Sequence, residues 1–115
     1  MQDKLLIASK VKKTIEYIEK CTINYPHTEV ILKNKIIESC YELLELVYMA
    51  NVHKEDVHKK NIIVKIRMIE YYVKISLNKQ LISFKKYENI GNHLLEINKM
   101  VIVWLKNEEK EKHLQ

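Results

Sequence analysis

The chain has 115 residues, of which 47% are hydrophobic and 30% charged, and its formal net charge is +5. A single Gly and a single Pro argue against sheets and turn-rich folds, and the hydrophobic content excludes a disordered chain. No apolar run approaches the roughly 20 residues of a membrane span, and no signal peptide is visible. We therefore expect one cytoplasmic domain over residues 1–115 with no membrane segment.

The first predicted helix spans residues 3–23. One face of it carries apolar residues at helical spacing, namely Leu5, Ala8, Val11, Ile15 and Ile18. Pro26 biases the residue before it away from helix, so the first helix should end near Ile23.

The second predicted helix spans residues 28–50, with Thr28 as its N-cap. Its inward stripe should be Leu32, Ile36, Cys40, Leu43, Val47 and Ala50. A second apolar stripe lies beside the first and consists of Ile37, Tyr41, Leu44 and Tyr48. Cys21 and Cys40 both fall in helical patterns without a CxxC spacing, so we expect two reduced thiols.

The third predicted helix spans residues 57–79, and the fourth spans residues 83–108 with Ser83 as its N-cap. The inward stripe of the third is Ile62, Ile66, Ile69, Val73 and Leu77, flanked by Val64, Met68, Tyr71 and Ile75. The stripe of the fourth is Phe84, Tyr87, Ile90, Leu94, Ile97, Val101 and Trp104. Residues 109–115 should form a charged tail.

Short connections between long helices predict an all-α, antiparallel up-down-up-down four-helix bundle. The flanking stripes make the apolar face of each helix wider than a monomeric bundle needs. A large apolar patch left exposed promotes association with other copies of the chain. We therefore expect a homo-oligomer, with Tyr87, Ile97, Met100 and Trp104 as core or subunit-interface anchors.

Positive charge is concentrated in residues 52–80, which carry seven Lys or Arg against three acids. Lys60, Arg67 and Lys74 repeat every seven residues and should line one outward stripe, broadened by Lys59 and Lys65 and ended by Lys79. A solvated helix face is one interpretation. The second interpretation is a surface that binds the phosphate backbone of RNA, with DNA as a further candidate. A symmetric oligomer favours it, because the positive charge is repeated in every subunit.

The sequence predicts no enzyme, no cofactor and no metal site. Glu55-x-x-His58 has the spacing found in carboxylate-bridged di-metal bundles, but no second copy exists, and His58 lies at a helix start. His93 is interpreted as a helix-surface histidine, and Trp104 as an anchor and not a base-stacking group.

Several segments carry a family resemblance. The last helix contains Ile82-Ser83, Tyr87, Leu94-Leu95-Glu96-Ile97, Lys99-Met100 and Trp104-Leu105-Lys106. Upstream stand Tyr25-Pro26-His27-Thr28 and the run from Ser39 to Ala50. Over roughly residues 10–107 the chain resembles the accessory variability determinant proteins of diversity-generating retroelements. The chain departs from them at Asn98, Ile102 and Val103, where small residues are expected.

The resemblance implies a barrel-like homopentamer that binds a reverse transcriptase and its template RNA and supports mutagenic cDNA synthesis without catalysing it. An alternative is the related four-helix-bundle protein of ribosomal RNA intervening sequences, with a structural or nucleic-acid-binding role, although its usual Asn-Ile-Ala-Glu-Gly-type motif is missing here. A small helical metalloprotein or other enzyme is a third class, which the missing ligand residues disfavour.

Overall fold

A computed structural model describes the backbone of residues 2–114 and the side chains of residues 6–111. Four long helices, α1 (Gln2–Thr22), α2 (Val30–Val52), α3 (Asp56–Asn78) and α4 (Phe84–Leu114), are joined by short connections. The first connection includes the 3₁₀ helix η1 (His27–Glu29). No strand occurs within residues 2–114, so the predicted all-α class and its four helices are confirmed.

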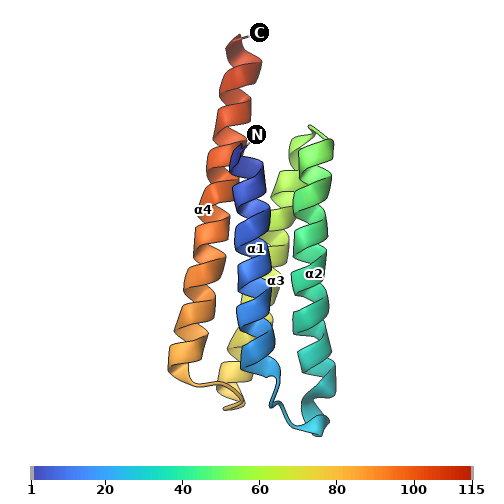
Figure 1. Ribbon diagram of the computed structural model, residues 1–115, viewed down its shortest axis with the longest axis vertical. Helices are drawn as coiled ribbons and strands as arrows, with labels where there is room; N and C mark the ends of the chain where they lie inside the picture. Colours follow the sequence, from blue (N-terminus) through green and yellow to red (C-terminus); the bar gives the residue numbers. More distant parts are fainter. Residues whose placement is uncertain (1, 115) are drawn as a thin grey trace.

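The four helices lie side by side in a rod of 54 × 22 × 20 Å. In Figure 1 the chain descends along α1, returns along α2, descends along α3 and rises along α4, which extends beyond the other helices. α1 packs against α2 and α4, and α3 packs against the same two helices. α1 and α3 therefore occupy opposite corners of the bundle.

The helix ends follow from local chemistry. The Ser83 hydroxyl accepts a hydrogen bond from the Lys86 amide at 3.1 Å, as expected of an N-cap. Thr28 does not cap α2, because it lies within η1, and α2 begins only at Val30. The predicted end of the last helix at residue 108 is also wrong, since α4 continues to Leu114.

α3 ends in a Schellman motif, in which the Leu81 amide donates to the Ser76 carbonyl at 2.9 Å and the Gln80 amide donates to the Leu77 carbonyl at 2.9 Å. The first residue after the helix cap, which donates the second of these bonds, must take the left-handed conformation. Gln80 does so, with φ of 63°. Glycine is the usual residue there, because a Cβ makes this conformation costly.

The core consists of apolar side chains from all four helices, and most of the predicted inward positions are buried. The completely or almost completely buried aliphatic residues include Val11, Ile18, Ile36, Leu43, Ile62, Ile69, Ile90, Leu94, Ile97 and Val101. Each such side chain contributes about 1.5–3 kcal/mol through removal from water. Phe84 was wrongly expected inside, since it is 62% exposed at the first turn of α4. The predicted core position Leu5 lies outside the described side chains.

Apolar side chains remain on the surface of α2 and α3, where the flanking stripes were expected. Tyr41, Tyr48 and Val52 of α2 are exposed, and so are Val64, Met68 and Tyr71 of α3. The α2 residues border a shallow groove of about 420 Å³, which is also lined by Leu44, Glu45, Met49 and His53. The single chain therefore leaves two helix faces only partly covered.

Candidate nucleic-acid interface

The charged stripe of α3 is the main candidate surface. Lys60, Arg67 and Lys74 are exposed on α3, which places one cation on every second turn of the helix. Val64 and Tyr71 are exposed at the intervening helical positions. An RNA strand along this stripe would meet cations for its phosphates and one aromatic ring for a base.

Two other predicted cations form surface ion pairs. The Lys65 ammonium lies 3.5 Å from a carboxylate oxygen of Glu42, and the Lys79 ammonium donates to Glu29 at 3.0 Å. Surface pairs of this kind contribute little to stability and are screened by salt. A phosphate could therefore compete for either lysine, although the nearby carboxylates reduce the local positive field.

Lys59 has to be removed from the predicted surface. Its side chain is completely buried, and its ammonium lies 2.6 Å from a carboxylate oxygen of Glu108 and 4.9 Å from the ring centroid of Trp104. Lys60, Arg67 and Lys74 recur every seven residues, and position 59 does not belong to this series. It lies on the buried face of α3, in the same stripe as Ile62 and Ile66. In this arrangement Lys59 balances a carboxylate inside the protein and is not available to phosphate.

The four expected anchors lie on or beside the core of the single chain. Ile97 and Trp104 are buried, whereas Tyr87 and Met100 are partly buried and pack against the core. The Lys74 ammonium lies 5.4 Å from the ring centroid of Tyr87, so this ring links the charged stripe of α3 to α4. Trp104 is only 5% exposed, which leaves it no face for base stacking in this structure.

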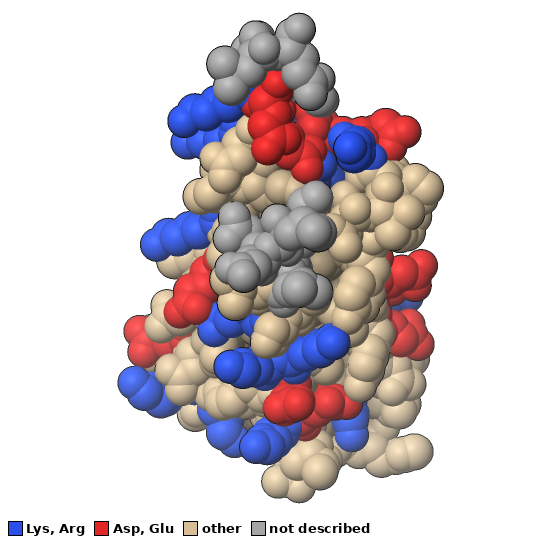
Figure 2. Space-filling view, turned by 45° about the horizontal axis from the view of Figure 1, so that its top comes forward, with Lys and Arg blue, Asp and Glu red and all other residues tan. Residues whose placement is uncertain are grey.

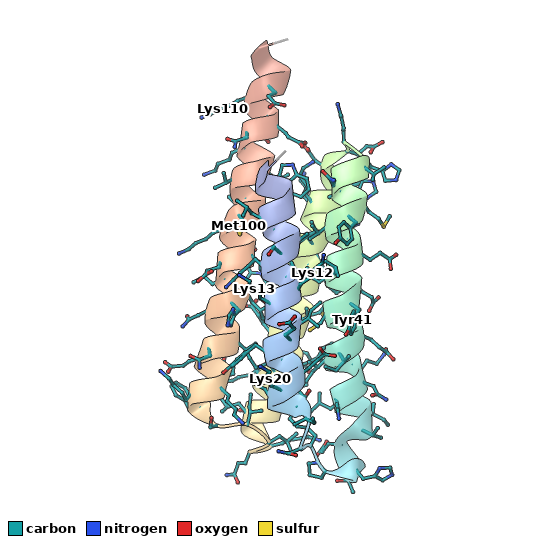
Figure 3. All side chains as sticks on the ribbon, in the orientation of Figure 1. Lys12, Lys13, Lys20, Tyr41, Met100 and Lys110 are labelled. Atoms are coloured by element: carbon teal, nitrogen blue, oxygen red, sulfur yellow. The ribbon has the colours of Figure 1, made fainter. Side chains whose placement is uncertain are left out.

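A second group of exposed cations, which the charge pattern of the sequence does not single out, lies on α1. Lys12, Lys13 and Lys20 are exposed there (Figure 3), on the helix diagonally opposite α3. The Lys12 ammonium lies 5.7 Å from the ring centroid of Tyr48 on α2. On the face shown in Figure 2, basic and acidic side chains alternate and do not form a single basic patch.

A polar cluster joins α1 to α4. The Lys10 ammonium lies 2.9 Å from a Glu96 carboxylate oxygen and 3.0 Å from Nδ1 of His93, whose ring contacts the Tyr17 ring. Partial burial, and secondarily the positive charge of Lys10, lower the pKa of His93. His93 is therefore not the plain surface histidine that the sequence suggested, and Lys10 is occupied within the chain.

The fold and surface define an all-α four-helix protein in which no helix of the described residues is long and apolar enough to span a membrane. Comparison with protein families supplies the identity: the model of the bAvd-like family matches residues 5–108. The chain belongs to the bAvd-like family, and the resemblance to accessory variability determinant proteins is confirmed. No curated protein matches the chain significantly.

Proposed function

We propose that this protein is a non-enzymatic accessory subunit of a diversity-generating retroelement. It binds the reverse transcriptase and the template RNA in the cytoplasm and supports mutagenic cDNA synthesis, while the polymerase does the chemistry. Membership of the bAvd-like family is the observation that carries this proposal. A scaffold that holds RNA and enzyme together acts by raising their effective concentration.

The proposed RNA surface is the α3 stripe of Lys60, Arg67 and Lys74, with Lys65 and Lys79 at its margins. DNA could use the same contacts, because phosphates and not bases would be recognised. The exposed apolar face of α2 supports assembly into a ring-like homo-oligomer of up-down-up-down bundles, a pentamer by family resemblance. Such a ring repeats the stripe in every subunit and strengthens attraction to a polyanion.

The RNA surface is tested by binding of labelled template RNA, followed by fluorescence anisotropy at several salt concentrations. The triple variant Lys60→Glu/Arg67→Glu/Lys74→Glu should weaken binding by more than about tenfold and flatten its salt dependence. The control, Lys12→Glu/Lys13→Glu/Lys20→Glu, makes the same change in net charge on the opposite corner of the bundle. Equal weakening in both triples would leave only a nonspecific charge effect and reject the α3 stripe.

The polymerase partner is tested by co-purification with the reverse transcriptase, with and without ribonuclease treatment. Recovery of the enzyme in both conditions would support a direct protein contact. Absence of recovery in both would contradict the accessory role.

A further inference from the structure

The connection between α2 and α3 holds a feature that the proposed function does not use. Only His53, Lys54 and Glu55 separate the two helices. The backbone is fixed at both ends, because the His53 amide donates to the Met49 carbonyl at 2.8 Å and the His58 amide donates to the Glu55 carbonyl at 3.3 Å. This short, anchored connection keeps the side chains at the end of α2 close to those at the start of α3.

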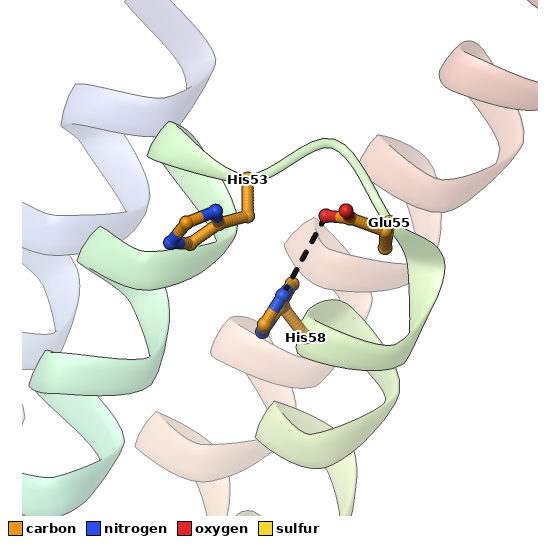
Figure 4. Close-up of side chains that lie close together, drawn as sticks. All are labelled: His53, Glu55 and His58. Atoms are coloured by element: carbon orange, nitrogen blue, oxygen red, sulfur yellow. Dashed lines mark ion pairs between the residues drawn. The ribbon is translucent and has the colours of Figure 1, made fainter.

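Three potential metal ligands meet there (Figure 4). The rings of His53 and His58 have their centroids 5.1 Å apart, and Nε2 of His58 lies 3.7 Å from a carboxylate oxygen of Glu55. One ligand atom from each of the three residues can be chosen so that all lie within 4.8 Å of one another. His53 comes from the α2 side of the turn, so the Glu55-x-x-His58 spacing alone could not reveal this set.

Two imidazoles and one carboxylate form a donor set that suits Zn²⁺ and similar transition metals, and that the harder Mg²⁺ does not favour. Zinc–ligand distances of about 2.0–2.2 Å place tetrahedral donors roughly 3.3–3.6 Å apart. The Glu55–His58 separation is already near this value. The other distances between ligand atoms, which reach at most 4.8 Å, can shorten to this range by small rotations of the His53 and Glu55 side chains, which are exposed.

We propose that His53, Glu55 and His58 form a binding site for Zn²⁺ or a related transition-metal ion, which joins the end of α2 to the start of α3. Three protein ligands leave one position of a tetrahedral ion for water or for a ligand from another molecule. A bound ion stabilises the folded chain by an amount that rises with the logarithm of its concentration above the dissociation constant. The simpler role of Glu55 and His58 is an ion pair without metal, and the experiment separates the two.

The test is isothermal titration of untagged, chelator-treated protein with ZnCl₂, accompanied by thermal unfolding with and without the metal. The expected result is one zinc ion per chain and an unfolding temperature that rises with Zn²⁺ but not with Mg²⁺. His53→Gln/His58→Gln and Glu55→Gln should each weaken zinc binding by more than about tenfold. Circular dichroism checks that these surface variants are folded.

The matched control is His27→Gln, since His27 is an exposed histidine in η1 at the opposite end of α2. This variant should bind zinc as the unaltered protein does. The proposal is overturned if the unaltered protein takes up no zinc at concentrations up to about 100 µM, an affinity of roughly 5.5 kcal/mol. It is equally overturned if the double histidine variant binds zinc as tightly as the unaltered protein.

Discussion

The ammonium nitrogen of Lys59 lies 4.9 Å from the ring centroid of Trp104, inside the bundle where α3 meets α4. Glu108 joins the two, because one of its carboxylate oxygens lies 2.6 Å from Lys59 and the other accepts a hydrogen bond from the Trp104 indole at 2.8 Å. A lysine cation is attracted to the face of an indole ring, and more strongly when water is excluded. The three groups therefore fix the C-terminal half of α4 against the start of α3.

Glu108→Gln should destabilise the protein by about 3 kcal/mol, because it leaves the Lys59 ammonium buried without a balancing charge. Lys59→Met should cost less, about 1 kcal/mol, because the carboxylate that it leaves behind on Glu108 is 17% exposed, reaches water and keeps its bond to Trp104, and methionine fills a similar volume. Urea unfolding at a fixed protein concentration measures both changes.

The double variant Lys59→Met/Glu108→Gln closes the thermodynamic cycle. It should be more stable than Glu108→Gln alone, with a coupling free energy above about 1 kcal/mol. If Glu108→Gln unfolds at the same urea concentration as the unaltered protein, the ion pair makes no contribution in solution.

The helices and the core could be predicted from sequence because both depend on periodicity, which a single chain displays directly. Ile36, Leu43 and Ile97 are buried as the 3.6-residue repeat requires. Phe84 shows the limit of this reasoning. It continues the stripe of α4 by spacing, yet it lies in the first turn, where the bundle no longer covers that face.

The charged residues were harder to place, because a lysine has the same formal charge whether it faces solvent or a buried carboxylate. The burial of Lys59 cannot be read from the sequence, because its partner Glu108 is distant along the chain. His53 was missed as a ligand candidate for a related reason. Its distance from His58 depends on the path of the turn, and no repeat in the sequence encodes that path.

Gln80→Gly should stabilise the protein by about 1 kcal/mol. Gln80 has a φ of 63° at the end of α3, and glycine adopts this conformation without the penalty of a Cβ. Thermal unfolding should show a midpoint several degrees higher. The control Gln80→Ala retains the Cβ and should bring no such gain.

Gly91→Ala should also stabilise, by about 0.5–1 kcal/mol, because glycine in a helix interior costs more backbone entropy than alanine. Gly91 lies within α4, and an added Cβ would meet no atom within 4 Å in the single chain. The midpoint of thermal unfolding reports the change. A loss of stability instead would indicate that another subunit packs closely against this position.

Cys40 should make the protein less stable at alkaline pH. Burial, and secondarily the charge of Glu19, raise the pKa of the Cys40 thiol to about 12 from an ordinary value of 9.0. Above pH 9 the unfolded chain gains stability by ionising this thiol while the folded chain keeps it protonated. The unfolding free energy should therefore fall between pH 9 and 12, by at most about 1.4 kcal/mol per pH unit from this group.

The pH dependence is checked by urea unfolding from pH 8 to pH 10.5 in the unaltered protein and in two variants that cannot ionise at this position. Cys40→Ala and Cys40→Val should both show a shallower alkaline slope, whatever their stability at pH 8. An unchanged slope in both would mean that Cys40 ionises equally in the folded and unfolded chains.

The groove along α2 is the face on which we expect subunits to meet. Tyr48 and Val52 border it and are 43% and 73% exposed in the single chain. Tyr48→Glu/Val52→Glu should leave each bundle folded, since both side chains lie outside the core, but should place charge in an apolar contact and dissociate the oligomer. Light scattering should then report a lower mass at the same protein concentration.

Ile23→Glu, a similar change at an exposed apolar residue beyond the end of α1, should keep the mass unchanged. A mass that is equal in all three proteins would place the subunit contact elsewhere, and the exposed stripe of Val64, Met68 and Tyr71 on α3 would then be the next face to alter.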